Sequence, residues 1–167
     1  MKIFICLIIF LIAIVFACKY KNHYDYKLAI VQEILAYIEF YDNNISLFKE
    51  NLIEINNRYI ITQKNKNAKQ YCFIENYVIK HNKNIEIFNE NDNRIINDYL
   101  SGIGKNEYEF EKEKNKSILN FLNKLQEKTK EEVKTKGELG AKIIVAIGAV
   151  LAILVWWKLW MCQYYLK

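Results

Sequence analysis

Residues 139–157 read LGAKIIVAIGAVLAILVWW, nineteen residues that carry a single charge, on Lys142. A transmembrane helix needs about 20 predominantly apolar residues, so this stretch is long enough to cross a bilayer. If it were buried in a soluble fold, so apolar a helix would need a larger core than the rest of the chain provides. The stretch therefore predicts a helix that crosses a membrane. Indole rings suit its membrane–water boundary, and the candidate interface aromatics are Trp156, Trp157 and Trp160.

The N-terminus holds a second apolar run, IFICLIIFLIAIVFAC at residues 3–18, with a lysine on either side. As a helix these sixteen residues span roughly 24 Å, and flanking lysines can snorkel to reach the surfaces of a ~30 Å hydrocarbon core. Three interpretations are open: an uncleaved transmembrane helix, a secretory signal peptide cut near Ala17, and a lipoprotein signal that would anchor Cys18. We favour the uncleaved helix, because Phe16 is bulky for a lipoprotein cleavage motif and because the other end of the chain is also a span.

Lysines near the two spans predict the orientation of the chain, since cytoplasmic flanks carry an excess of Lys and Arg. Those on the middle-domain side outnumber those on the far sides, which are Lys2, Lys158 and Lys167. The middle domain is therefore predicted to be cytoplasmic, with both termini outside the cell membrane. Lysines close to the bilayer on the cytoplasmic side can also rest on anionic lipid. These membrane-surface candidates are Lys19, Lys21, Lys134, Lys136 and Lys142.

The overall composition favours helices and excludes some functions. Apolar residues make up 52% of the chain and charged residues 26%, proline is absent and glycine occurs five times. Residues 19–138 hold all 19 acidic residues and 20 of the 24 Lys and Arg, so their net charge is only +1. A nucleic-acid interface needs cations concentrated on one face, so no nucleic-acid partner is predicted.

Apolar residues in the middle of the chain recur at helical spacing. A stripe from Leu28 to Ile38 predicts a helix over residues 24–41 that continues from the first span. The cluster Asp42–Asn44 predicts the end of this helix, since Asp and Asn favour caps and turns. Further helices are predicted near residues 45–61, 71–78 and 94–100.

A long helix is predicted to begin after Gly102 and Gly104 and to end near Lys136, from where Gly137 and Gly140 lead into the second span. In it Asn106 and Glu109 have the spacing of an N-cap and its N3 partner. The corner at the start of this helix is acidic and is a candidate surface for a basic protein partner; the alternative is an ordinary solvated helix start. The partner-contact candidates are Gly104, Asn106, Glu107, Glu109 and Glu111.

These patterns predict an all-α protein with three parts. Residues 1–20 form an N-terminal transmembrane helix, residues 21–138 a cytosolic antiparallel helical bundle, and residues 139–167 a C-terminal transmembrane helix with an aromatic tail. Small residues recur four apart in both spans, at Ala13 and Ala17 and at Gly148 and Ala152, and would allow close helix approach or homo-oligomers.

The sequence offers little to a catalytic site. His23 and His81 have no spaced ligand partner, and glycine-rich phosphate loops and nucleophile motifs are missing. The four cysteines, at positions 6, 18, 72 and 162, show no paired metal-binding spacing. We therefore predict a protein that is not an enzyme and that has no cofactor and no metal.

The layout of a short N-terminal span, a helical domain and a long helix that leads into a C-terminal span resembles the stage III sporulation protein AB family. Residues Leu100–Gly104, followed by Asn106, Glu107 and Glu111, are similar to a Leu-Gly stretch of that family. Leu139 and Gly140, before the final span, are similar to its Leu-Gly pair. The chain departs from the family at Glu111, where glutamine is usual, and at Asp42–Asn44, where a glycine and proline turn is usual.

This resemblance implies a membrane component of the channel complex between mother cell and forespore, similar to the platform protein of type II secretion and type IV pilus machines. Its implied role is to position a cytosolic assembly ATPase beneath other channel-complex membrane proteins, without catalysis of its own. Its implied location is the mother-cell membrane around the forespore. Two alternatives stay open: an exported lipoprotein or ligand-binding module anchored through Cys18, and a two-span phage or stress membrane protein.

Overall fold

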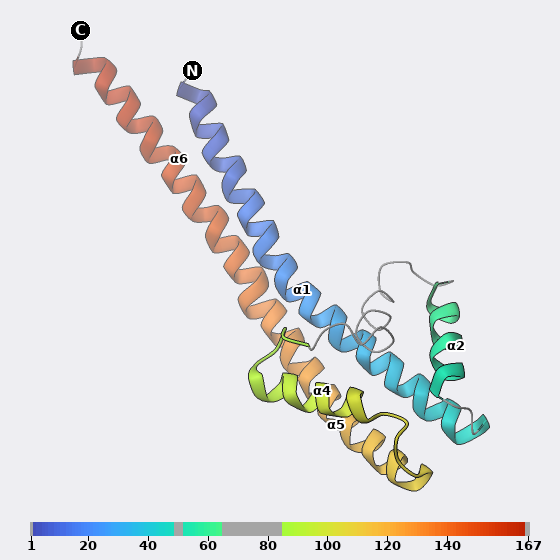
Figure 1. Ribbon diagram of the computed structural model, residues 1–167. Coiled ribbons are helices and arrows are strands. Elements are labelled where there is room, and N and C mark those ends of the chain that lie inside the picture. The colour runs from blue at the N-terminus through green and yellow to red at the C-terminus, as the bar shows by residue number, and fades with distance from the viewer. Residues whose placement is uncertain (1, 49–51, 65–84, 166–167) are drawn as a thin grey trace. The chain divides into compact units, whose positions relative to one another are not determined.

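The computed structural model describes residues 2–48, 52–64 and 85–165, and every regular element in these ranges is a helix (Figure 1). The elements are listed in chain order: α1 Lys2–Phe48, α2 Leu52–Lys64, α4 Glu90–Gly102, α5 Tyr108–Glu132, η2 Val133–Glu138 and α6 Leu139–Tyr165. No strand occurs in the described part of the chain. The all-α prediction is therefore confirmed, whereas the helix predicted near residues 71–78 lies outside the described residues.

The chain divides into two compact units. The terminal unit consists of Met1–Tyr26 and Thr129–Lys167, and the middle unit of Lys27–Lys128. The sequence predicts the borders of the middle domain at residues 21 and 138, whereas the middle unit begins six residues later and ends ten residues earlier. This difference arises because α1 and the segment before α6 continue to pack on each other beyond their apolar stretches.

Helix α1 does not end at Asp42–Asn44, as the sequence predicted, but runs on to Phe48. Asp42 and Asn44 of that cluster have tertiary partners instead of capping the helix. Asn115 donates from Nδ2 to Oδ1 of Asp42 at 2.8 Å, and Arg58 of α2 donates from Nη1 to Oδ1 of Asn44 at 3.1 Å. Asp and Asn favour caps through local hydrogen bonds, and here these other bonds replace them.

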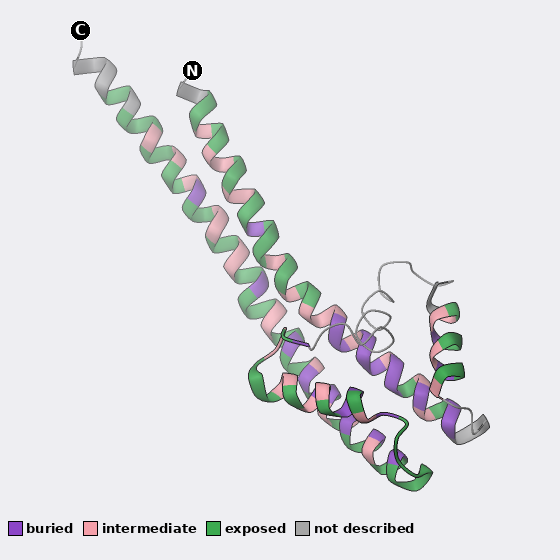
Figure 2. Ribbon diagram, in the orientation of Figure 1, coloured by how far each residue is buried: buried purple, intermediate pink, exposed green. Residues whose placement is uncertain are grey.

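The middle unit has one hydrophobic core, to which α1, α2, α4 and α5, the helices described in this unit, all contribute. The predicted stripe of α1 supplies its largest share, and Val31, Ile34 and Ile38 are fully buried. Purple ribbon in Figure 2 marks this buried face. Tyr37 and Tyr59 meet edge to face across α1 and α2, with ring centroids 5.2 Å apart. The predicted amphipathic character of α1 is thus confirmed.

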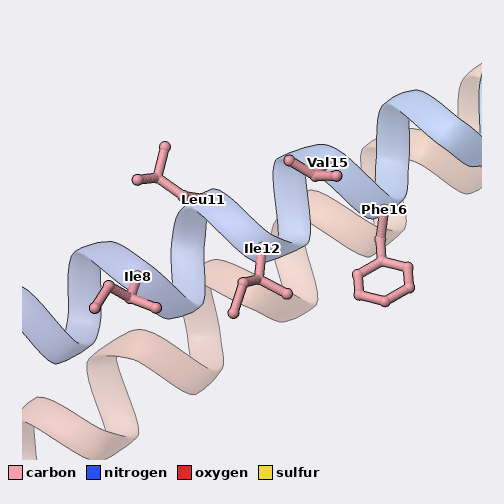
Figure 3. Close-up of a pocket in the computed structure, with 5 residues that line it drawn as sticks. All are labelled: Ile8, Leu11, Ile12, Val15 and Phe16. Atoms are coloured by element: carbon pink, nitrogen blue, oxygen red, sulfur yellow. The ribbon is translucent and has the colours of Figure 1, made fainter.

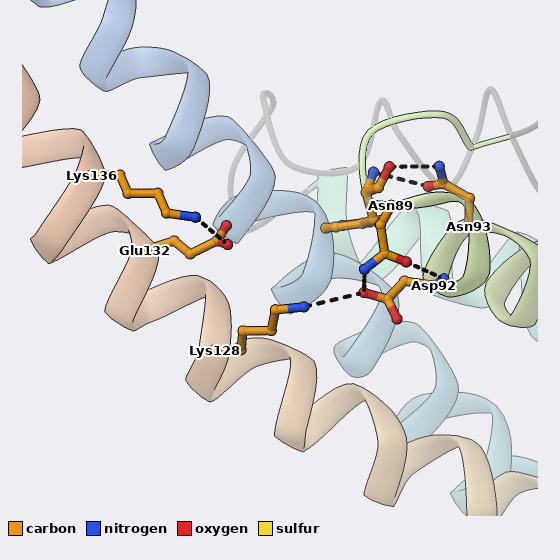
Figure 4. Close-up of polar contacts among 7 residues, drawn as sticks. Asn89, Asp92, Asn93, Lys128, Glu132 and Lys136 are labelled. Carbon is orange, nitrogen blue, oxygen red and sulfur yellow. Dashed lines mark hydrogen bonds and ion pairs between the residues drawn. The ribbon is translucent and has the colours of Figure 1, made fainter.

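Helices α4 and α5 run antiparallel within the middle unit. Tyr99 near the end of α4 donates to Asn115 near the start of α5 at 2.6 Å, and Asp92 at the start of α4 lies 3.8 Å from Lys128 at the end of α5. Asn89 caps α4 by accepting from the backbone N–H of Asp92 at 2.8 Å (Figure 4). Helix α4 ends at Gly102, as the sequence predicted, but begins one turn earlier than predicted.

The terminal unit exposes most of its apolar side chains, in contrast to the middle unit. Green ribbon dominates α6 and the first part of α1 in Figure 2. Phe16 is 62% exposed and Ile153 is also 62% exposed, although both lie in strongly apolar sequence. The two helices are long and apolar enough to cross a membrane. The C-terminal apolar stretch is therefore not the buried core of a soluble fold.

Candidate functional site

The first part of α1 packs on α6 through residues with little or no side chain. Gly148 lies so close to Ala13 that an added Cβ atom would collide with the Cβ atom of Ala13. Ala17 is 4% exposed, although it lies in an otherwise exposed apolar helix. Small residues of this kind let two helix backbones approach closely, as they do in membrane helix pairs. We call Ala13, Ala17, Gly140 and Gly148 the helix-pair interface.

Aromatic rings extend this contact toward the middle of the chain. Tyr20 lies over Gly140, where a Cβ atom would collide with its ring, and Tyr24 lies over Gly137, where a Cβ atom would be 3.3 Å from the Cβ atom of Tyr24. The two tyrosine hydroxyls are 3.3 Å apart. Glycine at these two positions therefore provides the space that each ring occupies.

The three close pairs define a constant antiparallel register. The residue numbers of each pair, 13 with 148, 20 with 140 and 24 with 137, add up to 160 or 161. At about 1.5 Å per residue, positions with this sum lie at the same level along the two helices. Figure 1 shows the same arrangement, with the N- and C-terminal ends at the same end of the pair.

This register aligns the charges that border the apolar stretches. Lys19 is the first charge after the apolar run of α1, and Lys142 is the last charge before that of α6; both lie at the same level and are exposed. At the other end, positions 2 and 158 are also level with each other, and both are lysines. The two helices therefore share one uncharged zone with borders that match to within about one residue, or ~1.5 Å.

The tryptophans predicted as interface aromatics lie near the end of this zone at positions 2 and 158, which we call its outer border. Trp156, Trp157 and Trp160 are each about half exposed. The rings of Trp157 and Trp160 stand side by side, with centroids 6.5 Å apart. Their distribution along α6 is typical of aromatic residues at a membrane surface.

The face of α1 that carries Phe16 forms a shallow, wholly apolar groove (Figure 3). It is lined by Ile8, Leu11, Ile12, Val15 and Phe16. No polar side chain lines this groove, so it offers neither hydrogen bonds nor charge to a polar ligand.

Two of the other membrane-surface candidates, Lys134 and Lys136, lie farther from the apolar zone than Lys19 and Lys142. Lys136 pairs with Glu132 at 3.1 Å (Figure 4). Lys134 and Lys136 both belong to η2, about 12 and about 9 Å beyond the level of Lys142. Lys21 lies at the level of Gly140, inside the border region, and is half-buried.

The η2 segment is a π-helix, and it keeps Thr129 and Gly137 on the same face of the helix. Thr129, which is 2% exposed, and Gly137, which is also buried, are eight residues apart. Two α-helical turns take about 7.2 residues, whereas one α turn and one π turn of about 4.4 residues take about 8. The π turn therefore returns Gly137 to the face of Thr129. The sequence did not indicate this π-helix. It predicted only that the long helix ends near Lys136 and that Gly137 and Gly140 lead into the second span.

The acidic corner at the start of α5 is partly inward-facing. Glu111 is 2% exposed, and its Oε1 atom accepts from the backbone N–H of Asn106 at 3.2 Å and from its side chain at 2.9 Å. The structure thus pairs Asn106 with Glu111 and not with Glu109, because α5 begins at Tyr108, later than the sequence predicted. Glu107 and Glu109 are exposed, so they are the carboxylates of this corner that a partner would meet.

Gly104 shapes the same corner. Its φ of +72° lies in the left-handed region, which side chains other than glycine rarely adopt. A Cβ atom there would also come within 3.1 Å of the side chain of Leu52. Gly104 is therefore required by the turn, whereas its exposed backbone remains accessible to a partner.

A buried polar cluster lies close by, and sequence reasoning did not find it. Asn115 is fully buried and joins Tyr99 of α4 to Asp42 of α1 through hydrogen bonds of 2.6 and 2.8 Å. Burial raises the pKa of Tyr41 to about 12, helped by the charge of Glu111, and also raises the pKa of Tyr37 and of Tyr99 above the usual range. These phenols are therefore neutral at physiological pH and serve as hydrogen-bonding groups of the core.

The described residues contain no group of three or more His, Cys, Asp or Glu that could hold a metal ion. Cys6 and Cys18 are free thiols, and His23 packs edge to face on Tyr24, with ring centroids 5.5 Å apart. His81 and Cys72 lie outside the described residues. The contacts assembled here are those of helix packing.

Comparison of the chain with protein-family models, with curated proteins and with solved structures gave no match.

Proposed function

We propose that the chain is a two-span membrane anchor that holds a helical scaffold domain at the cytoplasmic surface of a membrane. The matched register of α1 and α6 is the observation that carries this proposal. Two exposed apolar helices pack through Ala13 and Gly148, and their charges begin at one common level, at Lys19 and Lys142. In a bilayer the hydrocarbon chains would cover the apolar surface of such a pair, and its charged borders would lie at the headgroups and water.

The orientation part of the proposal rests on the lysine distribution. Positive charge is concentrated on the side of the middle unit, which favours a cytoplasmic position for that unit and an external one for both termini. The middle unit would then be an antiparallel bundle of α1, α2, α4 and α5 next to the inner leaflet.

The scaffold part rests on the resemblance to the stage III sporulation protein AB family. In this proposal the bundle positions an assembly ATPase beneath the channel between mother cell and forespore, and any enzymatic activity belongs to that ATPase. Glu107 and Glu109 are both exposed at the start of α5 and are the proposed contact for a basic surface of the partner. Negative side chains also suit the positive end of a helix dipole, so the corner is stable without the partner.

The scaffold proposal is tested in the source cell during sporulation. Deletion of the chain should stop spore formation after engulfment, and the double variant E107K/E109K should lose most of its cross-linking to the assembly ATPase. The control is E127K, because Glu127 is exposed at the opposite end of the same helix. Normal spore numbers in the deletion strain would contradict the scaffold role. The membrane anchor has a test of its own, which is resistance to alkaline carbonate extraction.

A further inference from the structure

We call the end of the uncharged zone at Lys19 and Lys142 its inner border. The lysines near this border differ in how they can contact a membrane. Lys19 and Lys142 lie at one level along the two packed helices, and Lys21 lies within two residues of it. Between positions 19 and 22 of α1 and between positions 139 and 142 of α6 there is no acidic residue. This level therefore carries three positive charges at the place where the apolar zone ends, and the nearest acids, Asp25 and Glu138, lie one helical turn from Lys21 and Lys142 on the side away from that zone.

The next level, farther from the apolar zone, is electrostatically mixed. Asp25 and Glu138 lie there, and Glu132 pairs with Lys136 at 3.1 Å. Lys134 and Lys136 are also about 12 and about 9 Å beyond Lys142 along the helix, which exceeds the Debye length of about 8 Å at physiological ionic strength. The attraction of these two lysines to lipid phosphates at the level of Lys142 is therefore screened, and for Lys136 it is also offset by the carboxylate of Glu132.

We infer that Lys19, Lys21 and Lys142 form a belt that binds the phosphate groups of anionic phospholipids in one leaflet. This inference rests on the proposed membrane anchor. Lys19 follows directly on the apolar run and Lys142 directly precedes one, so a headgroup whose acyl chains lie against either run places its phosphate at the level of an ammonium group. The ring of Tyr20 fills the contact over Gly140 at the same depth, as aromatic rings do at headgroup level.

The ligand of the belt is a layer of lipid headgroups and not free phosphate, because the three lysines do not converge on one pocket. At about 100° per residue, Lys19 points away from the face that carries Ala17, whereas Lys21 flanks that face. A single small anion would touch one lysine at a time, whereas a layer of lipid headgroups meets all three. Each lysine near an anionic surface is expected to contribute about fivefold in affinity.

The test measures retention of phosphatidylglycerol and of phosphatidylcholine by the full chain in mild detergent, by native mass spectrometry. The wild type should prefer phosphatidylglycerol, and K19Q/K21Q/K142Q should weaken its retention by roughly a hundredfold. The matched control K134Q/K136Q should stay within about twofold of the wild type, and K19R/K21R/K142R should keep the preference. Equal retention by the glutamine triple variant and the wild type would overturn the belt, as would displacement of the lipid by millimolar inorganic phosphate.

Two further readouts keep this test separate from the membrane anchor itself. Resistance of the glutamine triple variant to alkaline carbonate extraction, together with loss of the lipid preference, would support the belt. An inserted wild-type chain whose phosphatidylglycerol preference does not fall between about 50 and about 500 mM salt would overturn the belt and leave the anchor intact. This salt series uses the wild type alone, so the result does not depend on how any variant folds.

Discussion

At the scale of single residues, Gly148 has the most sharply defined requirement, because the Cβ atom of Ala13 already fills the space where its side chain would be. We expect Gly148→Ala to destabilise the helix pair by about 1–3 kcal/mol through overpacking. Moving the methyl group to the other helix, in G148A/A13G, should restore most of the loss. Thermal unfolding of the full chain in detergent measures both effects.

The control for this pair is Ala146→Val, since position 146 is exposed on the same helix. That variant should unfold within about 0.5 kcal/mol of the wild type. If G148A were as stable as the wild type, or if A13G failed to rescue it, then Ala13 and Gly148 would not be in contact.

Asn115 is the residue on which the buried polar cluster depends. Asn115→Ala would remove the hydrogen-bond partner that Asn115 provides to the hydroxyl of Tyr99 and to the carboxylate of Asp42. We expect a loss of about 2–3 kcal/mol in the free energy of unfolding, because buried polar groups that lose partners keep their desolvation cost. Urea denaturation followed by circular dichroism measures it, and N120A, an exposed asparagine of the same helix, should change little.

The buried tyrosines predict how stability depends on pH. Their pKa is raised by burial, so between pH 10 and about 12 the unfolded chain has released protons that Tyr41 still holds in the folded state. The stabilisation that comes from the raised pKa of Tyr41 is fully present below pH 10 and is lost as the pH rises toward 12. Urea midpoints at rising pH should therefore drop for the wild type, and the drop should be smaller for Y41F than for Y108F, which removes an exposed hydroxyl. An identical decline in both variants would contradict the role of Tyr41.

At the scale of elements, the π-helix η2 makes the most specific prediction. Removal of one residue, Thr135, would let Val133–Glu138 become a regular α-helix and would leave Gly137 within about 20° of the face of Thr129, because seven α-helical residues turn by about 700°. Insertion of one alanine after Thr135 would instead turn Gly137 and the residues after it by about 100° away from that face. The insertion should therefore weaken the packing of Tyr24 over Gly137 and lower the unfolding temperature of the full chain, whereas the deletion should change it little. An equal loss in both variants would mean that the π turn does not set the orientation of Gly137.

Elements with a strong local pattern were predictable from the sequence. The stripe that contains Val31, Ile34 and Ile38 is buried as expected, and α4 ends at Gly102. Both features depend on residues close together in the chain, namely the 3.6-residue period and the freedom of glycine.

Features that depend on distant partners were not predictable. Asp42 looks like a helix end in the sequence, but its partner Asn115 is 73 residues away and keeps it inside α1. Phe110 looks like a core residue but is 60% exposed, because the buried face of α5 instead carries Glu111 and Asn115. A hydrophobicity pattern excludes buried polar residues from the core, so it assigns the wrong face wherever a polar cluster is packed inside.

At the scale of the whole molecule, the chain joins a pair of apolar helices to a helical domain with one core. Low helix content in detergent would contradict the fold, and release by alkaline carbonate would contradict the anchor. The predicted topology places residues 21–138 on the cytoplasmic side and both termini outside.

Two native cysteines report on these two sides. Cys72 lies in the middle of the chain and Cys162 follows the second apolar stretch, so a chain with Cys6 and Cys18 replaced by serine keeps one probe for each side. The decisive measurement is labelling of this chain in intact protoplasts with a membrane-impermeant maleimide. The account predicts that Cys162 is labelled at once and Cys72 only after lysis, whereas labelling of Cys72 in intact protoplasts would contradict it.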